Sequence, residues 1–162
     1  MFKEATFLAL DSLFRDKIAL DFEGLQVSFQ ANPGLKSVNI NLFLPLEIPS
    51  DYKDLLKKYN GFTLYEFQDL GGFSFFDANQ MRIETQQQKE AYEDEWEDRI
   101  ILIATIIADG DFIGLRILDH GGYEVLDGYH DEVPQNWEVI TDSLDVFLWK
   151  LIESRGKRFW LS

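Results

Sequence analysis

Apolar side chains recur every three or four residues in three parts of the chain, and this period predicts three amphipathic helices. The first lies near the amino terminus, the second in residues 51–59, and the third begins after residue 142. Each helix would bury one face in a common core. These faces consist of Phe7, Leu10, Leu13 and Phe14, of Tyr52, Leu55, Leu56 and Tyr59, and of Leu144, Phe147, Leu148, Leu151 and Ile152.

Two of these helices carry start or stop signals. Pro49 suits the first turn of the second helix, where its missing N–H is no loss. Asn60 and Gly61 tolerate the left-handed conformation in which many helices end. Asp142 or Ser143 would cap the start of the last helix.

Other segments alternate apolar and polar residues, which predicts antiparallel strands. Residues 25–29 and 38–42 alternate on either side of a turn at 32–34, as a hairpin would. Residues 62–76 form an aromatic-rich strand region that a glycine pair interrupts.

The carboxyl-terminal half contains a predicted meander of three strands. Residues 100–107 are apolar throughout and rich in β-branched side chains, which is typical of a strand buried on both faces. Asp-Gly turn chemistry then leads to residues 112–118, and a glycine pair leads to residues 123–126. The sequence therefore predicts one α+β domain over residues 1–162, a mainly antiparallel twisted sheet with helices packed on it.

The composition of the chain excludes several classes of protein. A chain of 162 residues with 46% hydrophobic residues is one domain in size and can build its own core. The absence of cysteine excludes disulfides, thiolate metal sites and cysteine nucleophiles. Residues 1–17 contain acidic residues, unlike a signal peptide, and the longest apolar run is about half a membrane span. We therefore expect a cytoplasmic protein that does not bind membranes.

The charge of the chain favours a protein partner over a nucleic acid. Fifteen basic residues against 29 acidic ones give a formal charge of −14, which repels DNA, RNA and anionic membranes. The same field would steer a basic protein towards the chain and raise its association rate. Solubility is an equally good reading of the charge taken alone.

One acidic segment is the predicted contact surface. Aromatic side chains surrounded by charge are typical of protein interfaces, and residues 92–98 combine the two. The alternative is an exposed polar helix whose tryptophan packs on the core. The candidate contact residues are Tyr92, Glu93, Asp94, Glu95, Trp96, Glu97 and Asp98, together with Asp111 in a later turn. The apolar tail at 159–161 would either fill a groove or serve self-association.

A metal-dependent enzyme is a remote alternative. Its possible ligands are Asp109, Asp111, His120, Asp127, His130 and Asp131. The same residue types are common in hairpin turns, and the spacing of these residues matches no strict metal-ligand pattern. No nucleophile elbow or glycine-rich phosphate loop is present, so we expect neither catalysis nor a cofactor.

Three landmarks occur in order along the chain: IPSDYKDLLKKYNG at 48–61, IADGDFIGLRI followed by YEVLDGYHD within 107–131, and ITDSLDVFLWKL at 140–151. Together they resemble the SUKH superfamily, which includes fungal regulators of cell-wall synthesis and bacterial immunity proteins. The resemblance is strongest over residues 46–152, whereas the helix and hairpin predicted in residues 1–44 are atypical of the family.

The resemblance implies a single α+β domain that binds a protein and does not catalyse a reaction. Bacterial relatives bind and block a toxin, often a nuclease or deaminase, so we expect a basic cognate toxin domain as partner. A regulatory or scaffold module without a toxin is the alternative, and a monomer or weak homodimer is expected. The matching motif residues, for which a mainly structural role is expected, are Pro49, Asn60, Gly61, Gly110, Asp142 and Ser143. For Asp111, which also matches, a turn and a partner contact both stay open.

Overall fold

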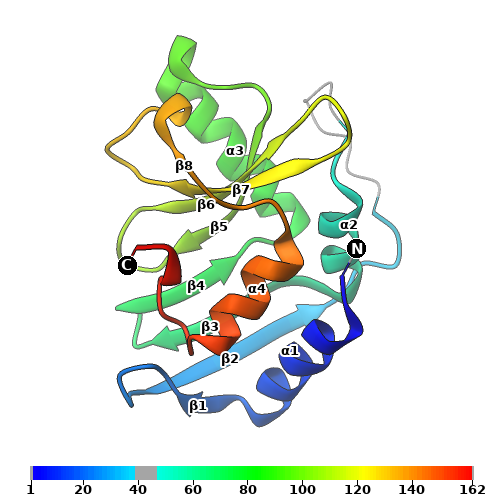
Figure 1. Cartoon of the computed structure of the whole chain (residues 1–162), viewed down its shortest axis with the longest axis vertical. Helices are drawn as coiled ribbons and strands as arrows, with labels where there is room; N and C mark the ends of the chain where they lie inside the picture. Colours follow the sequence, from blue (N-terminus) through cyan, green and yellow to red (C-terminus); the bar gives the residue numbers. More distant parts are fainter. Residues whose placement is uncertain (1, 39–46, 162) are drawn as a thin grey trace.

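The computed structural model describes residues 2–38 and 47–161. In this part of the chain, strands β1 to β8 form one antiparallel sheet in which each strand pairs with its sequence neighbours (Figure 1). The strands are β1 (Ile18–Leu20), β2 (Gln26–Pro33), β3 (Tyr59–Phe67), β4 (Gly71–Phe75), β5 (Ile100–Ile106), β6 (Phe112–Ile117), β7 (Tyr123–Gly128) and β8 (Glu138–Thr141). The α-helices are α1 (Glu4–Asp16), α2 (Ser50–Lys58), α3 (Ala78–Tyr92) and α4 (Leu144–Glu153), and the 3-10 helices are η1 (Glu93–Glu95), η2 (Pro134–Asn136) and η3 (Phe159–Leu161). The predicted α+β fold class is confirmed.

The predicted meander is present as β5, β6 and β7, and β5 is the most deeply buried strand. Apart from the partly buried Thr105, all of its residues are buried, on both faces of the sheet. Helix α3 packs against β5, and α1 and α4 lie side by side in front of the sheet in Figure 1. The continuous apolar run of β5 follows from this cover on both faces.

The spacing of apolar side chains correctly predicted three helices and the core residues of their buried faces. Leu10 in α1, Leu55 and Leu56 in α2, and Phe147 and Leu148 in α4 are all at most 1% exposed. Helix α3 ends at Tyr92, the first residue of the acidic segment predicted as a contact surface.

The predicted end of the second helix is wrong. Helix α2 stops at Lys58, and Tyr59 is already extended, with φ −140° and ψ 121°. Gly61 does have a positive φ of +90°, but inside β3, where a side chain would come within 3.0 Å of the backbone nitrogen of Asp77. Its conformational freedom therefore allows a close approach of β3 to the start of α3. Pro49 precedes the helix as its cap residue and does not lie in the first turn.

The predicted pairing of residues 25–29 with residues 38–42 in a hairpin is wrong. Strand β2 pairs with β1 on one side and β3 on the other, and it continues through Pro33, where a turn was expected. Residues 39–42 of the predicted second strand lie outside the described residues. The observed hairpin closes at Asp21, whose Oδ1 accepts the backbone N–H groups of Glu23 and Leu25 at 2.9 Å each. The sequence analysis overlooked this turn, although it contains Gly24, at a positive φ of +80°, as well as the aspartate.

Candidate protein-binding site

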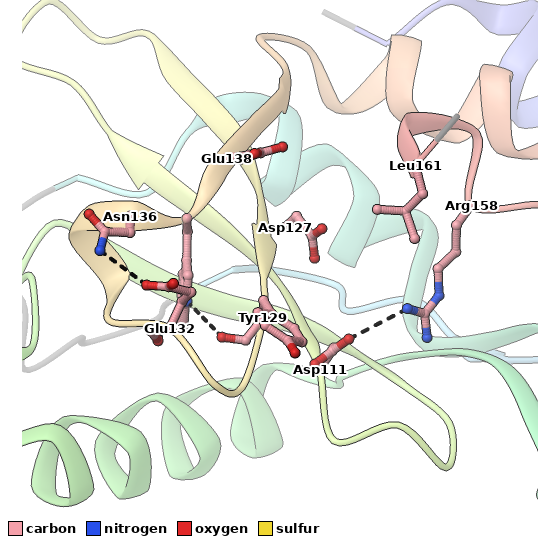
Figure 2. A pocket seen from close by; sticks show the side chains of 9 residues that line it. Asp111, Asp127, Tyr129, Glu132, Asn136, Glu138, Arg158 and Leu161 are labelled. Carbon is pink, nitrogen blue, oxygen red and sulfur yellow. Dashed lines mark hydrogen bonds and ion pairs between the residues drawn. The ribbon is translucent and has the colours of Figure 1, made fainter.

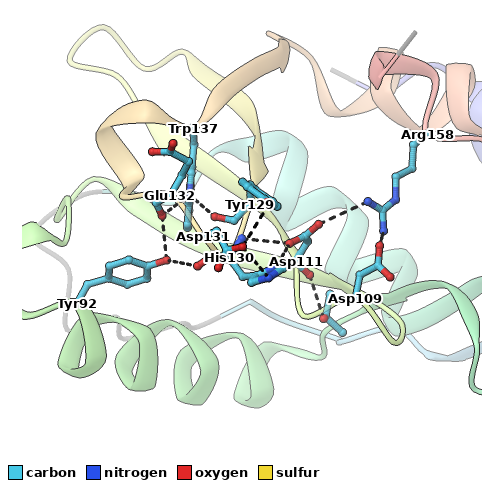
Figure 3. Close-up of polar contacts among 10 residues, drawn as sticks. Tyr92, Asp109, Asp111, Tyr129, His130, Asp131, Glu132, Trp137 and Arg158 are labelled. Carbon is cyan, nitrogen blue, oxygen red and sulfur yellow. Dashed lines mark hydrogen bonds and ion pairs between the residues drawn. The ribbon is translucent and has the colours of Figure 1, made fainter.

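Three aromatic side chains join the end of α3 to the loop between β7 and β8 (residues 129–137, the β7–β8 loop). The ring centroids of Tyr92, Trp96 and Trp137 lie 5.8 to 6.3 Å from one another. The Tyr92 hydroxyl donates to the backbone oxygen of Glu132 at 3.0 Å (Figure 3). Gln135 Nε2 donates to the backbone oxygen of Glu95 at 3.1 Å. These contacts fix the acidic turn η1 beside the β7–β8 loop.

The aromatic members of the predicted contact segment belong to this support and not to the exposed surface. Trp96 is only 7% exposed, because Tyr92 and Trp137 cover it. Trp96 therefore packs within the fold, as the alternative for this side chain expected, and the contact role of the segment stays a prediction. Tyr92 is partly buried, and burial is the main cause that raises the pKa of its hydroxyl.

The acidic members of the segment fall into two groups. Glu93, Asp94 and Glu95 are exposed in η1, which contains no basic residue. Glu97 instead forms a two-point ion pair with Arg116, at 2.8 and 3.2 Å. Asp98 is exposed and pairs with Lys89 at 3.1 Å. Of the predicted carboxylates, those of η1 are the ones that a partner can reach without breaking an ion pair.

Arg116 connects the segments beneath this surface through ion pairs and hydrogen bonds. Besides Glu97, its guanidinium donates to Glu124 at 3.0 Å and to the backbone oxygen of Pro134 at 3.3 Å. It thus links the segment after η1, strand β7 and the β7–β8 loop. Charge-assisted hydrogen bonds of this kind are stronger than hydrogen bonds between neutral groups.

A cavity of about 450 Å³ opens on the other side of the β7–β8 loop (Figure 2). Its lining includes the carboxylates of Asp111, Asp127, Glu132 and Glu138, and Arg158, from the segment after α4, contributes a positive charge (Figure 2). Its walls are formed by Asp111, Asp127, Tyr129, Glu132, Asn136, Trp137, Glu138, Arg158 and Leu161. Glu132 and Trp137 also contact the η1 support, so the acidic turn and the cavity form one surface.

Asp111 makes several contacts within the fold, and its role as a partner contact stays a prediction. Its Oδ1 accepts the backbone N–H of His130 at 3.1 Å and lies 2.6 Å from the Nδ1 of the same histidine. Its Oδ2 lies 3.4 Å from Arg158 Nη1, and Arg158 also pairs with Asp109 (Figure 3). The hydrogen bond to Asp111 is the main cause that raises the pKa of His130. Asp111 therefore orders the start of the β7–β8 loop and also lines the cavity.

Asp127 is the second carboxylate that the fold engages. Its Oδ2 accepts the indole N–H of Trp160 at 3.1 Å. Burial is the main cause that raises the pKa of Asp127, the bond from Trp160 lowers it, and repulsion from Asp111 raises it again. The cavity thus holds a half-buried carboxylate in a negative environment.

The residues weighed as metal ligands do not form a metal site in the described part of the chain. No group of three or more His, Asp or Glu side chains there could hold an ion. His120 is exposed on the turn between β6 and β7, apart from the cavity. Asp109 and Asp111 are occupied by Arg158.

The family-motif residues make contacts within the fold. Asn60 Oδ1 accepts the backbone N–H of Ala78 at 2.9 Å, which joins β3 to the start of α3. Ser143 caps α4 by accepting the N–H of Val146 at 3.3 Å, while Asp142 is exposed. Gly110 has a φ of +76° in the turn before Asp111.

The sequence analysis missed four residues that define this surface: Glu132, Trp137, Glu138 and Arg158. Trp137 was detectable, because a tryptophan within a polar segment needs a partner to cover it. Arg158 carries no such signal, since only folding brings it next to Asp111.

The fold and the site define an α+β domain with an open acidic surface supported by aromatic side chains. Residues 39–150 match the SMI1 / KNR4 family (SUKH-1), and the chain belongs to this family. The resemblance read from the three landmarks is thereby confirmed. No curated protein and no solved structure matches the chain. Family membership is consistent with a protein-binding domain, and the family is generally non-catalytic. None of the helices in the described residues has the length and apolar character to cross a membrane.

Proposed function

We propose that this protein is an immunity-type binding protein that blocks a basic toxin domain through its acidic face. We define the acidic face as the exposed carboxylates of η1 and of the β7–β8 loop, with the cavity beside them. Its exposed members are Glu93, Asp94, Glu95, Asp131 and Glu132. Membership of the SUKH-1 family supports a protein partner.

The observation that carries the proposal is the way two distant segments are fixed together into one acidic surface. The bond from Tyr92 to the Glu132 backbone and the packing of Trp96 on Trp137 hold η1 against the β7–β8 loop. Carboxylates on a rigid support lose little conformational freedom when they bind. Nucleases must hold phosphate and carry basic surfaces, so an acidic inhibitor can occupy the same surface.

Electrostatic steering gives the proposal a kinetic signature. The net charge of −14 raises the association rate with a basic domain, and salt screens this effect. We therefore expect the association rate, more than the dissociation rate, to fall with salt. A scaffold partner without a basic surface would lack this dependence.

The test is a pull-down from the protein's own cells at low and moderate salt, with two matched double variants. Asp94→Lys with Glu95→Lys reverses two charges in η1, while Asp16→Lys with Glu23→Lys reverses two exposed charges at the far end of α1 and in the β1–β2 turn. Glu93 is left intact because its φ is +55°, and Glu97 because it pairs with Arg116.

Recovery of one basic toxin domain by the wild type and the control variant, with loss in the η1 variant, would support the proposal. The purified protein should then abolish the toxin's activity in vitro. Recovery of signalling or housekeeping proteins instead would favour the regulatory or scaffold reading. Equal loss in both variants would show that net charge, and not this face, determines binding.

A further inference from the structure

The segment after α4 places an arginine on the carboxylates of the acidic cavity. Arg158 pairs with Asp109 and, at 3.4 Å, with Asp111, and its side chain is only 25% exposed. The chain carries nearly twice as many acidic as basic residues, and Arg158 is the basic residue in the lining of the cavity of about 450 Å³.

Arg158 lies between two cavities. The first, of about 450 Å³, contains Asp111, and the second, of about 520 Å³, contains Asp109 and is otherwise lined by residues such as Phe22 and Leu70. Arg158 lines both, as Figure 2 shows for the first. Its guanidinium thus shows, within the molecule, the kind of group that these carboxylates accept.

The backbone around Arg158 is anchored without its guanidinium. Phe159 and Trp160 pack on Phe147 of α4, with ring centroids 5.8 and 5.6 Å away, and the indole of Trp160 donates to Asp127. Therefore the Arg158 side chain can leave the carboxylates while the backbone stays in place. An arginine side chain is long, and exchanging one guanidinium for another keeps the same charge-assisted bonds.

Arg158 also lies outside the residues that match the family, which end at 150, whereas Asp109 and Asp111 lie inside them. We propose that Arg158 is an internal placeholder: it occupies in the free protein the two carboxylates that an arginine or lysine of the partner takes in the complex. This inference rests on the proposed function in that the acidic face receives a basic partner.

Only molecules in which the placeholder has left the site can bind the partner. The apparent affinity for the partner is therefore the intrinsic affinity multiplied by the fraction of molecules with a free site. If Arg158 is seated in about nine molecules of ten, removing it strengthens binding of a basic probe about tenfold. The probe is a fluorescently labelled nona-arginine peptide, whose binding is measured by anisotropy at low and moderate salt.

Loss of any positive charge favours a polycationic probe, so the test needs a charge-matched control. Arg158→Gln and Arg82→Gln each remove one positive charge, and Arg82 is exposed on α3, outside the lining of both cavities. We expect Arg158→Gln to bind the peptide about tenfold more tightly than Arg82→Gln. Equal affinities of the two variants would overturn the proposal.

A double-mutant cycle with Asp109→Asn gives a second readout that is independent of net charge. Asp109 is an exposed turn residue, so this change should leave folding intact. The proposal predicts that Asp109→Asn barely changes peptide affinity in the wild type, where Arg158 occupies the carboxylate, and weakens it several-fold in Arg158→Gln. Additive effects would contradict the proposal.

The outcomes separate this inference from the proposed function. The peptide experiments need no toxin, so their failure leaves the acidic face as a candidate binding surface but removes the placeholder. If the peptide results hold and no toxin is recovered or neutralised, the placeholder stands and the immunity function fails. Melting temperatures within a few degrees of wild type show that each variant is folded.

Discussion

Two polar clusters in this molecule have similar chemistry, but their members differ in exposure. The first, which we term the helix junction, consists of Tyr123, Asp51 and the backbone of Leu144. The Tyr123 hydroxyl donates to Asp51 Oδ2 at 2.6 Å and accepts the Leu144 N–H at 2.7 Å. The second, which we term the Asp111 cluster, consists of Asp109, Asp111, His130 and Arg158. The Asp111 side chain is 7% exposed, whereas those of His130 and Arg158 are 47% and 25% exposed.

The difference in exposure assigns different roles to the two clusters. Tyr123 and Asp51 are 8% and 7% exposed, and burial, followed by the hydrogen bond to Asp51, raises the pKa of Tyr123 well above its usual range. A buried hydrogen bond has no water to replace it, so it fixes α2, β7 and α4 together. Asp111 is itself only 7% exposed, but the side chains that pair with it, His130 and Arg158, reach solvent, so these ion pairs can exchange partners more readily than the bonds of the helix junction.

The largest expected effect is that of Tyr123→Phe. This change leaves the buried N–H of Leu144 without its acceptor and removes one hydrogen bond from Asp51. We expect a loss of about 3 kcal/mol in the free energy of unfolding, measured by urea denaturation.

The matched control is Tyr129→Phe in the β7–β8 loop. Tyr129 is 45% exposed and donates to Asp131 at 3.3 Å, so its hydroxyl can bond water instead. We expect no measurable change in the free energy of unfolding. Similar losses in the two variants would show that the contrast between the clusters is wrong.

The helix junction also shows which parts of the fold were predictable. The buried faces of α2 and α4 followed from local periodicity, as did the buried strand β5. The end of α2 did not, because Gly61 takes its positive φ for packing against Asp77, and that neighbour is close only in the folded chain. Local patterns locate elements, whereas tertiary contacts decide what a special residue does.

The candidate site was predictable to a similar extent. The acidic turn Glu93–Glu95 was found from composition, and it is exposed as expected. The partners of Trp96 and Glu97 could not be identified, because Trp137 and Arg116 come from later strands and loops. Arg158 was missed for the same reason, since its partners Asp109 and Asp111 lie far away in sequence.

The second prediction concerns Arg116, which is intermediate between the clusters in burial, with its side chain 16% exposed. Arg116→Gln loses the ion pairs with Glu97 and Glu124 and loosens the β7–β8 loop. We expect a loss of about 1.5 to 2 kcal/mol in urea denaturation and weaker binding of the basic partner. A variant with intact stability and intact binding would show that this support does not organise the acidic face.

The third and smaller effect is a pH dependence of the Asp111 cluster. The hydrogen bond to Asp111 raises the pKa of His130, so its stabilising contribution is full below the ordinary histidine value, about 6.5, and is lost as pH rises through the raised value. His130→Gln should therefore destabilise the protein at about pH 5.5 more than at about pH 8.5.

An NMR titration tests the cause directly. The midpoint of His130 should fall in Asp111→Asn, because the main cause of its raised pKa is removed. An unchanged His130 midpoint would show that Asp111 does not hold the imidazole in solution.

The smallest effect is expected for Asp127→Asn, and it separates the need for an acceptor from the need for a charge. Burial raises the pKa of Asp127, and the nearby carboxylates of Asp111 and Glu138 raise it further. The contribution of Asp127 to stability is therefore full below the ordinary aspartate pKa and is lost as pH rises through the raised pKa, so the charged form is unfavourable at neutral pH.

Asparagine keeps an oxygen acceptor for the Trp160 indole, and we expect stability at pH 7 to be equal or higher by about 0.5 kcal/mol or less. Asp127→Ala removes the acceptor and should cost about 1 kcal/mol. If Asp127→Asn were as destabilising as Asp127→Ala in thermal melts, the carboxylate itself would be required, and the exposed side of the molecule would depend on its charges for folding as well as for binding.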